Sequence, residues 1–246
     1  MEHKVGIIGM GWVGKAMLSV FPDAIDCDKG DNFERINSAD IAFVCVPTPL
    51  DNGKLDTSIV EAVVKHCTCP LIVIRSTVAV GTCDKLDRLG KNICYQPEYL
   101  GETVAHPLLQ ESERKFLIIG GRPENRRKLI ELYHNVYNAN IDIRQVSLME
   151  AEVIKLSENR AIAFKIAQCQ ELYDACQKNG VDYYTIRDAV YGDDPRFNLW
   201  FTFVYPKKRG FQSKCLPKDV YGWSDWAGTE LTKELLKYNE DLCSQS

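Results

Sequence analysis

The sequence predicts an α/β protein: a Rossmann-type doubly wound parallel sheet followed by a smaller, mostly α-helical domain. Three observations indicate this fold class. Short apolar runs alternate with helical patterns through residues 1–146, a glycine-rich turn follows the first run, and residues 148–178 form one uninterrupted helical pattern. Continuous apolar runs are typical of strands that a parallel sheet buries on both faces. We therefore expect one domain over residues 1–146 and a second over residues 147–246.

The apolar runs of the first domain are the expected strands. They cover residues 5–9, 24–27, 41–46, 71–75, 93–96 and 116–119, and residues 140–146 would be the last strand. The expected helices between them cover residues 12–20, 57–66, 82–89 and 123–136. Strands that alternate with helices favour parallel pairing.

The second domain begins with the long helical pattern. Residues 148–178 contain no proline and no glycine, and Asn179-Gly180 is a typical helix stop. Further helices are expected over residues 183–191 and 229–241. Residues 203–217 contain glycine, prolines and charges, so we expect an irregular loop there.

Composition excludes several classes of function. The net charge of −4 argues against a nucleic-acid partner, because neutralising phosphates requires a concentrated basic face. No apolar stretch approaches the roughly 20 residues that span a bilayer, so no membrane role is expected. Ten cysteines would suit a disulfide scaffold, but several lie in apolar runs and no secretory segment is evident. We expect reduced thiols in the cytoplasm, and no metal site, because no zinc-ligand spacing occurs.

The turn after the first strand, Gly9-Met10-Gly11-Trp12-Val13-Gly14, matches the dinucleotide pattern GxGxxG between a strand and a helix, which is the context it requires. The first glycine permits the tight turn, the second lets a pyrophosphate approach the backbone, and the third lets helix and strand pack closely. A diphosphate at the helix N-terminus would be favoured by its N–H groups and dipole.

Asp26 near the end of the second strand would bind the adenosine ribose. Its carboxylate favours NAD over NADP, since a 2′-phosphate would be repelled. The alternative, in which Asp26 and Asp28 are only turn residues, stays open.

Further polar loops follow other predicted strands, at the edge where open α/β sheets bind ligands. They are Val46-Pro47-Thr48-Pro49, Arg75-Ser76-Thr77-Val78 and Gln96-Pro97-Glu98-Tyr99-Leu100, with Glu102 just beyond. So many polar residues at the ends of neighbouring strands are difficult to explain by the needs of the turns alone.

These strings resemble the UDP-glucose/GDP-mannose dehydrogenase family, with its GxGYVG turn, Pro-Thr-Pro loop, Ser-Thr-Val segment and Pro-Glu-Phe-Leu loop followed by a glutamate. The resemblance covers nearly the whole chain. It continues along the long helix, through Ala151-Glu152, Lys155, Asn159, Ala163, Lys165 and Ile166. Its most specific part is Gly210-Phe211-Gln212-Ser213-Lys214-Cys215-Leu216-Pro217-Lys218-Asp219, which is similar to the family's Gly-Phe-Gly-Gly-Ser-Cys-Phe/Leu-Pro-Lys-Asp loop.

The resemblance implies NAD-dependent four-electron oxidation of the C6 alcohol of a nucleotide-linked hexose, UDP-glucose-like, to the uronic acid, as in polysaccharide biosynthesis. Asp219 would help to remove the alcohol proton through a water. Cys215 would form a thiohemiacetal and then a thioester, with Lys155 and Asn159 holding the oxyanion. Residues that match the positions for hydrolysis are Glu102 and Thr77, with Glu98 nearby.

The same resemblance gives the binding residues. The cofactor would contact Gly9, Gly11, Trp12, Val13, Gly14, Asp26, Pro47, Thr48, Thr77 and Glu102. The substrate would contact Lys155, Asn159, Gly210, Lys207, Lys208 and Arg209. A homodimer through the central helical domain is also implied.

The chain departs from the family in two places. Family members usually continue for over a hundred residues into a third domain that grips the nucleotide, so we expect a short form without it. Either such a form holds the substrate differently, or a separate chain supplies the missing part. Gln212, Ser213 and Lys214 replace Gly-Gly-Ser beside the proposed nucleophile, and the larger side chains would reshape the sugar pocket. We expect the basic residues at 207–209 to contact substrate phosphates in place of the third domain.

Two other functions remain open. A two-electron dehydrogenase of the β-hydroxyacid type also joins a Rossmann domain to a helical domain, and also uses a Lys-x-x-x-Asn helix. It needs no cysteine, and so leaves the Cys215 loop unexplained. A non-catalytic NAD-binding or regulatory homologue would bind the cofactor without turnover. Taken alone, Lys155 and Asn159 would suit a solvated helix face, and a lone cysteine is more often a buried hydrophobe.

Overall fold

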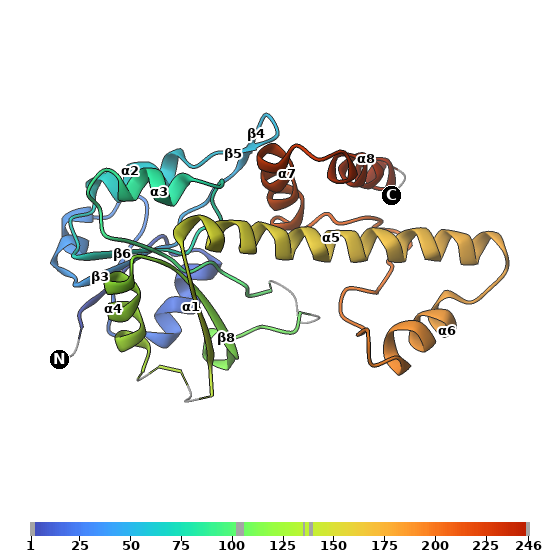
Figure 1. Cartoon of the computed structure of the whole chain (residues 1–246), viewed down its shortest axis with the longest axis horizontal. Coiled ribbons are helices and arrows are strands. Elements are labelled where there is room, and N and C mark those ends of the chain that lie inside the picture. Colours follow the sequence, from blue (N-terminus) through green and yellow to red (C-terminus); the bar gives the residue numbers. More distant parts are fainter. Residues whose placement is uncertain (1–2, 102–105, 135, 138–139, 245–246) are drawn as a thin grey trace. The chain divides into compact units, whose positions relative to one another are not determined.

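The computed structural model describes residues 3–101, 106–134, 136–137 and 140–244 (Figure 1). The chain divides into two compact units, Met1–Lys155 and Leu156–Ser246. The boundary that we expect after residue 146, between a cofactor-binding domain and a helical domain, stays a prediction.

A seven-stranded sheet forms the centre of the first unit, with the order β2-β1-β3-β6-β7-β8-β9. The strands are β1 (Val5–Ile8), β2 (Ile25–Cys27), β3 (Ile41–Val44), β6 (Leu71–Ile74), β7 (Ile93–Tyr95), β8 (Phe116–Gly121) and β9 (Asp142–Val146). Neighbouring strands pair in parallel except β7 and β8, which are antiparallel. The Rossmann-type fold class is therefore confirmed, as a mostly parallel sheet.

The sheet departs from the expected parallel pairing at β8 alone among its described strands. Residues 96–115 join β7 to β8, and their described part contains the short 3-10 helix η2 (Glu111–Glu113) and no crossover helix. A parallel connection needs a crossover of a dozen or more residues, usually helical. Without one, the chain returns antiparallel.

Helices cover both faces of this sheet. Strand residues alternate between the faces, so that Ile41 and Phe43 belong to one apolar cluster while Ala42 and Val44 belong to the other. Helices α1 (Trp12–Val20) and α4 (Pro123–Tyr133) pack on the first cluster, and α2 (Ser58–His66) and α3 (Thr82–Asp87) pack on the second (Figure 1). The two layers of helices bury the sheet and leave its edges for the loops.

Short elements of the first unit were not predicted. Strands β4 (Leu50–Asp51) and β5 (Lys54–Leu55) form a small antiparallel hairpin around Asn52-Gly53, where both residues have positive φ. A 3-10 helix, η1 (Phe33–Ser38), precedes β3. Two-residue strands are too short to show an apolar period, although the Asn-Gly pair is a hairpin signal.

One long helix, α5 (Leu148–Lys178), leads into the second unit, as predicted. It is followed by α6 (Tyr183–Asp188), the π-helical turn η3 (Ala189–Asp193), α7 (Leu216–Ala227) and α8 (Glu230–Ser244). Helix α7 was not predicted, and the irregular loop expected over residues 203–217 was wrong at its end. Pro217 was read as a helix breaker, but it lies in the first turn of α7, where a missing N–H costs nothing.

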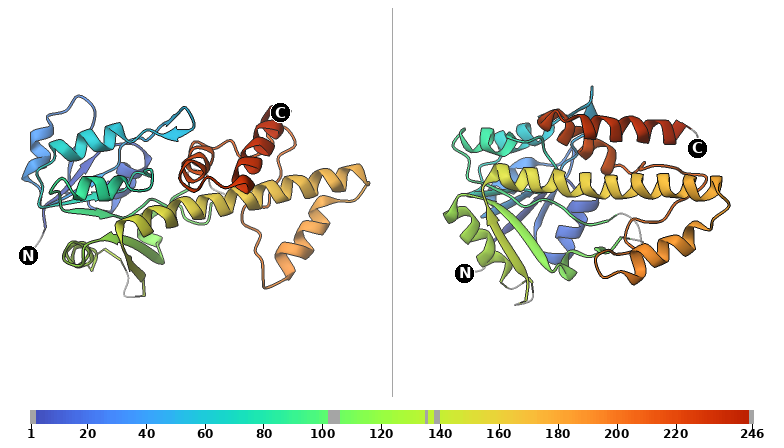
Figure 2. Two further views of the ribbon diagram at one scale, coloured as in Figure 1. Left: turned by 45° about the horizontal axis from the view of Figure 1, so that its top comes forward. Right: turned by 45° about the vertical axis from the view of Figure 1, so that its right-hand side comes forward.

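Two apolar clusters hold the second unit together along α5. One joins α5 to α7 and α8 through Ala163, Val220 and Leu235, and the other joins its C-terminal half to α6 through Cys176 and Tyr183. Within this unit, α7 and α8 lie on one side of α5 and α6 on the other (Figure 2). Among the described residues, no helix is both long enough and apolar enough to cross a membrane.

Four buried charges lie beneath the loops that follow β6 and β7, and we name them the buried quartet: Arg75, Glu98, Glu111 and Arg114. Arg75 Nη2 lies 2.5 Å from Glu98 and 3.1 Å from Glu111, and Arg114 lies 3.0 Å and 3.1 Å from the same two carboxylates. Burial alone would raise the pKa of Glu111, but the two guanidinium groups lower it. Two cations thus balance two anions.

Replacing Arg75 with methionine should destabilise the protein by roughly 3–5 kcal/mol, because two buried carboxylates would lose a counter-ion. The measurement is urea unfolding followed by circular dichroism. Arg122→Met is the matched control, since its ion pair with Asp87 is partly exposed and should contribute at most about 1 kcal/mol. Equal losses in the two variants would contradict a special role for the buried quartet.

Candidate functional site

The carboxyl edge of the sheet contains a topological switch point between β1 and β3. Strand β2 lies on one side of β1, whereas β3 and β6 lie on its other side. The chain therefore reverses direction across the sheet at β1, and a crevice for ligands is expected there. Gly9 donates its N–H to the carbonyl of Cys27 at 2.8 Å, and Cys45 donates to Ile8 at 2.8 Å. The turns that follow β1, β2 and β3 are therefore joined by backbone hydrogen bonds.

The glycine-rich turn has the shape that a dinucleotide requires. Gly9 has φ +90°, and a Cβ on it would lie 2.7 Å from the carbonyl oxygen of Cys45. A Cβ on Gly14 would lie 1.9 Å from the carbonyl oxygen of Gly9. Gly11, which caps α1, has no atom within 4 Å of its Cβ position. The first and third glycines pack tightly, and the second leaves room for a pyrophosphate, so these residues fit NAD.

The remaining residues predicted in this turn lie on or beside α1 and β2. Trp12 begins α1 and is 52% exposed, whereas Val13 is half-buried. Asp26 is exposed and lies one residue before the end of β2. Asp28 lies just beyond the strand and accepts the N–H of Lys29 at 2.9 Å. Two carboxylates are thus available beside the turn, and ribose binding by Asp26 stays a prediction.

The loops that follow β3 and β6 are tied to each other. The hydroxyl of Thr48 donates to the carbonyl of Thr77 at 2.7 Å, and that of Ser76 donates to the carbonyl of Val46 at 2.6 Å. Pro47, between these contacts, is exposed. The predicted residues Pro47, Thr48 and Thr77 thus lie together at the carboxyl edge.

Glu98 was predicted to assist hydrolysis, but the structure engages both of its oxygens. One oxygen contacts Arg75, and the other accepts hydrogen bonds from Arg114 and from the N–H groups of Tyr99 and Leu100. Glu98 therefore holds its own loop to the buried quartet. Glu102 lies outside the described residues.

Lys155, on α5, is buried, and its ammonium lies 4.7 Å from the ring centre of Tyr99. Glu152 lies one turn earlier on the same helix and accepts the N–H groups of Gly81 and Cys83 at 2.6 and 2.8 Å. Burial raises the pKa of this carboxyl. Glu152 was not predicted as a site residue, yet it fixes the start of α5 to the segment that follows Thr77.

In the second unit, the first turn of α7 holds a cluster of reactive groups. Cys215 is exposed and precedes the helix, and Asp219 lies one turn further and is fully buried. The Asp219 carboxylate accepts Asn159 Nδ2 at 2.6 Å and Lys218 Nζ at 2.6 Å. The predicted residues Cys215, Asp219 and Asn159 therefore lie on two adjoining helices. Lys218 lies within the motif, but its contact with Asp219 was not predicted from the sequence.

The Cys215 segment is held in place by Asn239 of α8. The amide oxygen of Asn239 accepts the N–H of Phe211 at 2.7 Å, and its nitrogen donates to the carbonyl of the same residue at 3.3 Å. Gly210 has φ +71°, and a Cβ on it would lie 2.5 Å from the Asn239 oxygen. Glycine is thus needed at 210 to hold the segment. Asn239 gave no signal in the sequence, because the contact spans 28 residues.

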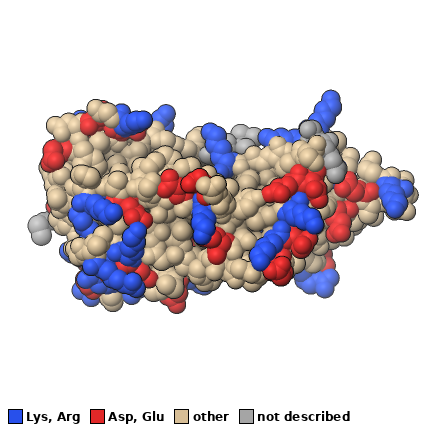
Figure 3. Space-filling model, turned by 90° about the horizontal axis from the view of Figure 1, so that it is seen from above, with Lys and Arg blue, Asp and Glu red and all other residues tan. Residues whose placement is uncertain are grey.

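Arg209 was expected to contact substrate phosphates, but its side chain is bound to α5. It donates to both oxygens of Asp174 at 2.8 Å and to Gln170 at 2.5 Å, and its guanidinium lies over the ring of Tyr173. These contacts anchor the Cys215 segment to α5. Lys207 and Lys208 are exposed in the preceding turn. On the face shown in Figure 3, basic and acidic side chains are interspersed.

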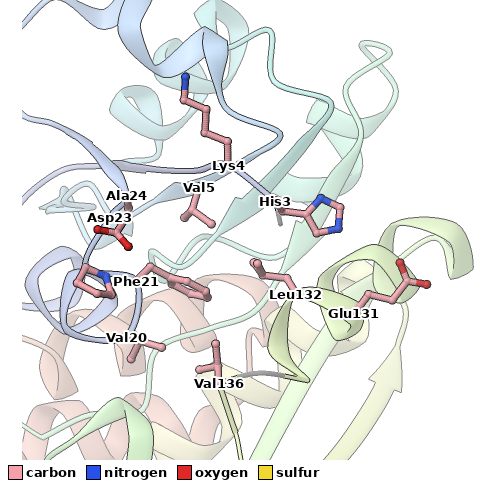
Figure 4. A pocket seen from close by; sticks show the side chains of 11 residues that line it. His3, Lys4, Val5, Val20, Phe21, Asp23, Ala24, Glu131, Leu132 and Val136 are labelled. Atoms are coloured by element: carbon pink, nitrogen blue, oxygen red, sulfur yellow. The ribbon is translucent and has the colours of Figure 1, made fainter. Parts of the chain in front are cut away.

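A pocket of about 490 Å³ lies at the amino ends of β1 and β2, the opposite edge of the sheet from Gly9 (Figure 4). Its lining residues are His3, Lys4 and Val5 at the start of β1, residues 20–24 between the end of α1 and β2, and Glu131, Leu132 and Val136 in and just after α4. It contains none of the predicted site residues. No group of three or more metal-ligating side chains gathers anywhere in the described part of the chain.

Comparisons with known proteins agree with this geometry. Residues 28–141 match the NAD binding domain of the UDP-glucose/GDP-mannose dehydrogenase family, and residues 149–241 match its central domain. A UDP-glucose 6-dehydrogenase from Rhizobium meliloti is 26% identical over 201 residues, which is 75% of this chain and 45% of that protein. The chain spans about half the length of the curated relatives it matches.

Solved structures show the same fold. A UDP-glucose dehydrogenase from Pyrobaculum islandicum has a TM-score of 0.81 and 20% identity, over 98% of this chain and 68% of that one. A 3-hydroxyisobutyrate dehydrogenase from Mycobacterium tuberculosis has a TM-score of 0.74 and 15% identity, over 99% and 96%. Proteins named as a UDP-glucose dehydrogenase and as a 3-hydroxyisobutyrate dehydrogenase thus share this fold, so the fold alone does not identify the reaction. The family assignment rests on the two family models. The chain belongs to the UDP-glucose/GDP-mannose dehydrogenase family, and its cofactor is NAD.

Proposed function

We propose that this chain oxidises the C6 alcohol of a nucleotide-linked hexose, UDP-glucose-like, to the carboxylate through a thioester on Cys215. The observation that carries the proposal is the cluster at the first turn of α7. There an exposed thiol precedes a fully buried carboxylate that an amide and an ammonium hold by hydrogen bonds. A nucleophile beside an ordered acid/base group is the arrangement that covalent catalysis requires.

The glycine-rich turn and the loops after β2, β3 and β6 would hold NAD, which accepts one hydride in each of two oxidations when bound. The N-terminus of α1 would receive the diphosphate, over Gly11. Asp26 would bind the ribose, and Thr48 with Thr77 would line the site. The chain's own residues then have to move protons and hold the reacting carbon.

In the first oxidation, the Asp219 carboxylate would take the alcohol proton through a water while the carbon loses a hydride. Asn159 and Lys218 keep this carboxylate in one orientation, because each donates to a different oxygen. The product is an aldehyde. The sulfur of Cys215, as the thiolate, would then add to the aldehyde carbon, and the former carbonyl oxygen becomes an oxyanion.

Lys155 and Asn159 would hold that oxyanion. They lie four residues apart on α5 and therefore share one helix face. Asn159 uses one amide N–H on Asp219, and an amide has a second to offer. Loss of the second hydride gives the thioester, which water cleaves to the carboxylate and the thiol. Two hydrides leave the carbon in total, and water supplies the new oxygen.

Water activation would fall to Glu102 and Thr77. We propose that Glu98 acts by holding its loop, because both of its oxygens already accept hydrogen bonds. A two-electron β-hydroxyacid reaction is the alternative, and it would make no use of the thiol.

We further propose that the protein works in the cytoplasm, in polysaccharide biosynthesis and without a nucleic-acid partner. The boundary between its two domains would lie near residue 146.

Replacing Cys215 with serine should lower turnover at least 10³-fold, because an alcohol is a much weaker nucleophile than a thiolate. The NAD dissociation constant should not change. The measurement is NADH formation with UDP-glucose, UDP-N-acetylhexosamines and GDP-mannose. Cys243→Ser, which alters another accessible thiol of the second unit, should leave turnover unchanged. Undiminished turnover in Cys215→Ser would favour the β-hydroxyacid type, and NAD binding without turnover in the native protein would favour a non-catalytic homologue.

Lys207 and Lys208 are proposed to contact the substrate phosphates, since both are exposed and Arg209 is bound to α5. Replacing both with glutamate should raise the substrate KM about tenfold or more and leave kcat unchanged. Lys233 and Lys237 of α8, replaced together, provide a control with the same change in charge. An unaltered KM would show that the two lysines do not contact phosphate.

We propose a homodimer that forms through the second unit. The segment 197–205 exposes five large apolar side chains: Phe197, Leu199, Trp200, Phe203 and Tyr205. Exposed apolar patches rich in aromatic residues are typical of interfaces. Replacing Trp200 and Phe203 with glutamate should therefore yield monomers in sedimentation equilibrium. A monomeric native protein would contradict the proposal.

A further inference from the structure

Two cations lie over the ring of Tyr99 in the first unit. The ammonium of Lys155 lies 4.7 Å from the ring centre, and the guanidinium carbon of Arg114 lies 5.2 Å from it. Distances below about 6 Å are those at which a cation is attracted by the negative face of an aromatic ring. The aromatic ring thus contacts both a group of the buried quartet and the lysine proposed to hold the oxyanion.

The position of this ring is fixed from several directions. The N–H groups of Tyr99 and of Leu100 both donate to Glu98 at 2.5 Å, which ties the backbone to the buried quartet. Phe116 of β8 packs against the ring at 5.2 Å between centres. Arg114 is itself held by the two carboxylates of the buried quartet. The ring is therefore a rigid surface attached to the sheet.

Lysine, by contrast, has a flexible stem. Four carbons separate its ammonium from the backbone, so an α5 backbone held in place does not by itself fix the ammonium. Lys155 is only 6% exposed, and in such a partly desolvated place a cation–π contact is stronger than on an open surface. Misplacing a catalytic group by about 1 Å can cost as much as 10²-fold in rate.

We propose that Tyr99 is a positioning residue that holds the ammonium of Lys155 through the face of its ring. The role rests on the proposed function, in which Lys155 holds the oxyanion of the thiohemiacetal. The ring face performs the positioning, and the phenol hydroxyl is not required for it. The buried quartet then has a second use, because it supports the ring that orients this lysine.

The kinetic test compares Tyr99→Phe with Tyr99→Leu. The phenylalanine variant keeps the ring face and should retain kcat within about twofold. The leucine variant should lower kcat roughly tenfold, as expected for loss of a partly desolvated cation–π contact, with the NAD dissociation constant unchanged. Tyr184→Leu is the matched control, because it removes a ring beneath Arg187, 4.9 Å away, in the second unit. Equal losses in the Phe and Leu variants would overturn the proposal.

A second readout does not depend on turnover. In protein labelled with ε-¹³C-lysine, the Lys155 signal, assigned by Lys155→Arg, should show the upfield ring-current shift of a group above an aromatic face. It should persist in Tyr99→Phe and move to the position of exposed lysines in Tyr99→Leu. An unshifted native signal would overturn the contact itself. A shift that disappears without loss of kcat would overturn the positioning role, and a native protein without turnover would remove the proposed function while leaving the contact measured.

Discussion

The buried quartet is the constraint on which the carboxyl edge of the first unit depends. Arg75 follows β6, Glu98 lies in the loop after β7, and Glu111 and Arg114 precede β8. Buried charges are costly unless each is paired, so these loops have few alternative arrangements. The same contacts lock the start of the Thr77 segment and the backbone of Tyr99 to the sheet. Fixed loops at a carboxyl edge are what a dinucleotide and a hydride transfer require.

The second unit combines an exposed thiol with a buried carboxylate that has hydrogen-bond partners. Asp219 is held by Asn159 and Lys218, while Cys215 stays exposed one helical turn earlier. Asn239 secures the segment from α8, and Arg209 secures it from α5. These contacts hold Arg209 and Phe211, just before the positions at which the chain departs from the family's glycine-rich loop. We propose that Cys215 and the exposed turn at Lys207 and Lys208 contact different parts of one substrate.

How much the sequence predicts depends on the range of the contacts involved. The strand and helix pattern, the glycine-rich turn and the Cys215 motif are local, so period and spacing reveal them. The antiparallel β8, the buried quartet and the clamp from Asn239 depend on residues far apart in the chain. Arg209 illustrates the limit: its charge suggested a phosphate, but Asp174 on α5 is its partner. Pro217 shows the converse, since a helix breaker in the interior is a favourable residue in the first turn.

The central claim is that one carbon loses two hydrides, the first before and the second after it becomes covalently bound to Cys215. The most direct measurement is the number of NADH molecules formed for each molecule of nucleotide sugar consumed, with the sugar product analysed by mass spectrometry. The account predicts two NADH and a uronic acid for each sugar, with no aldehyde released. One NADH for each sugar, with an aldehyde or ketone as the product, would contradict it.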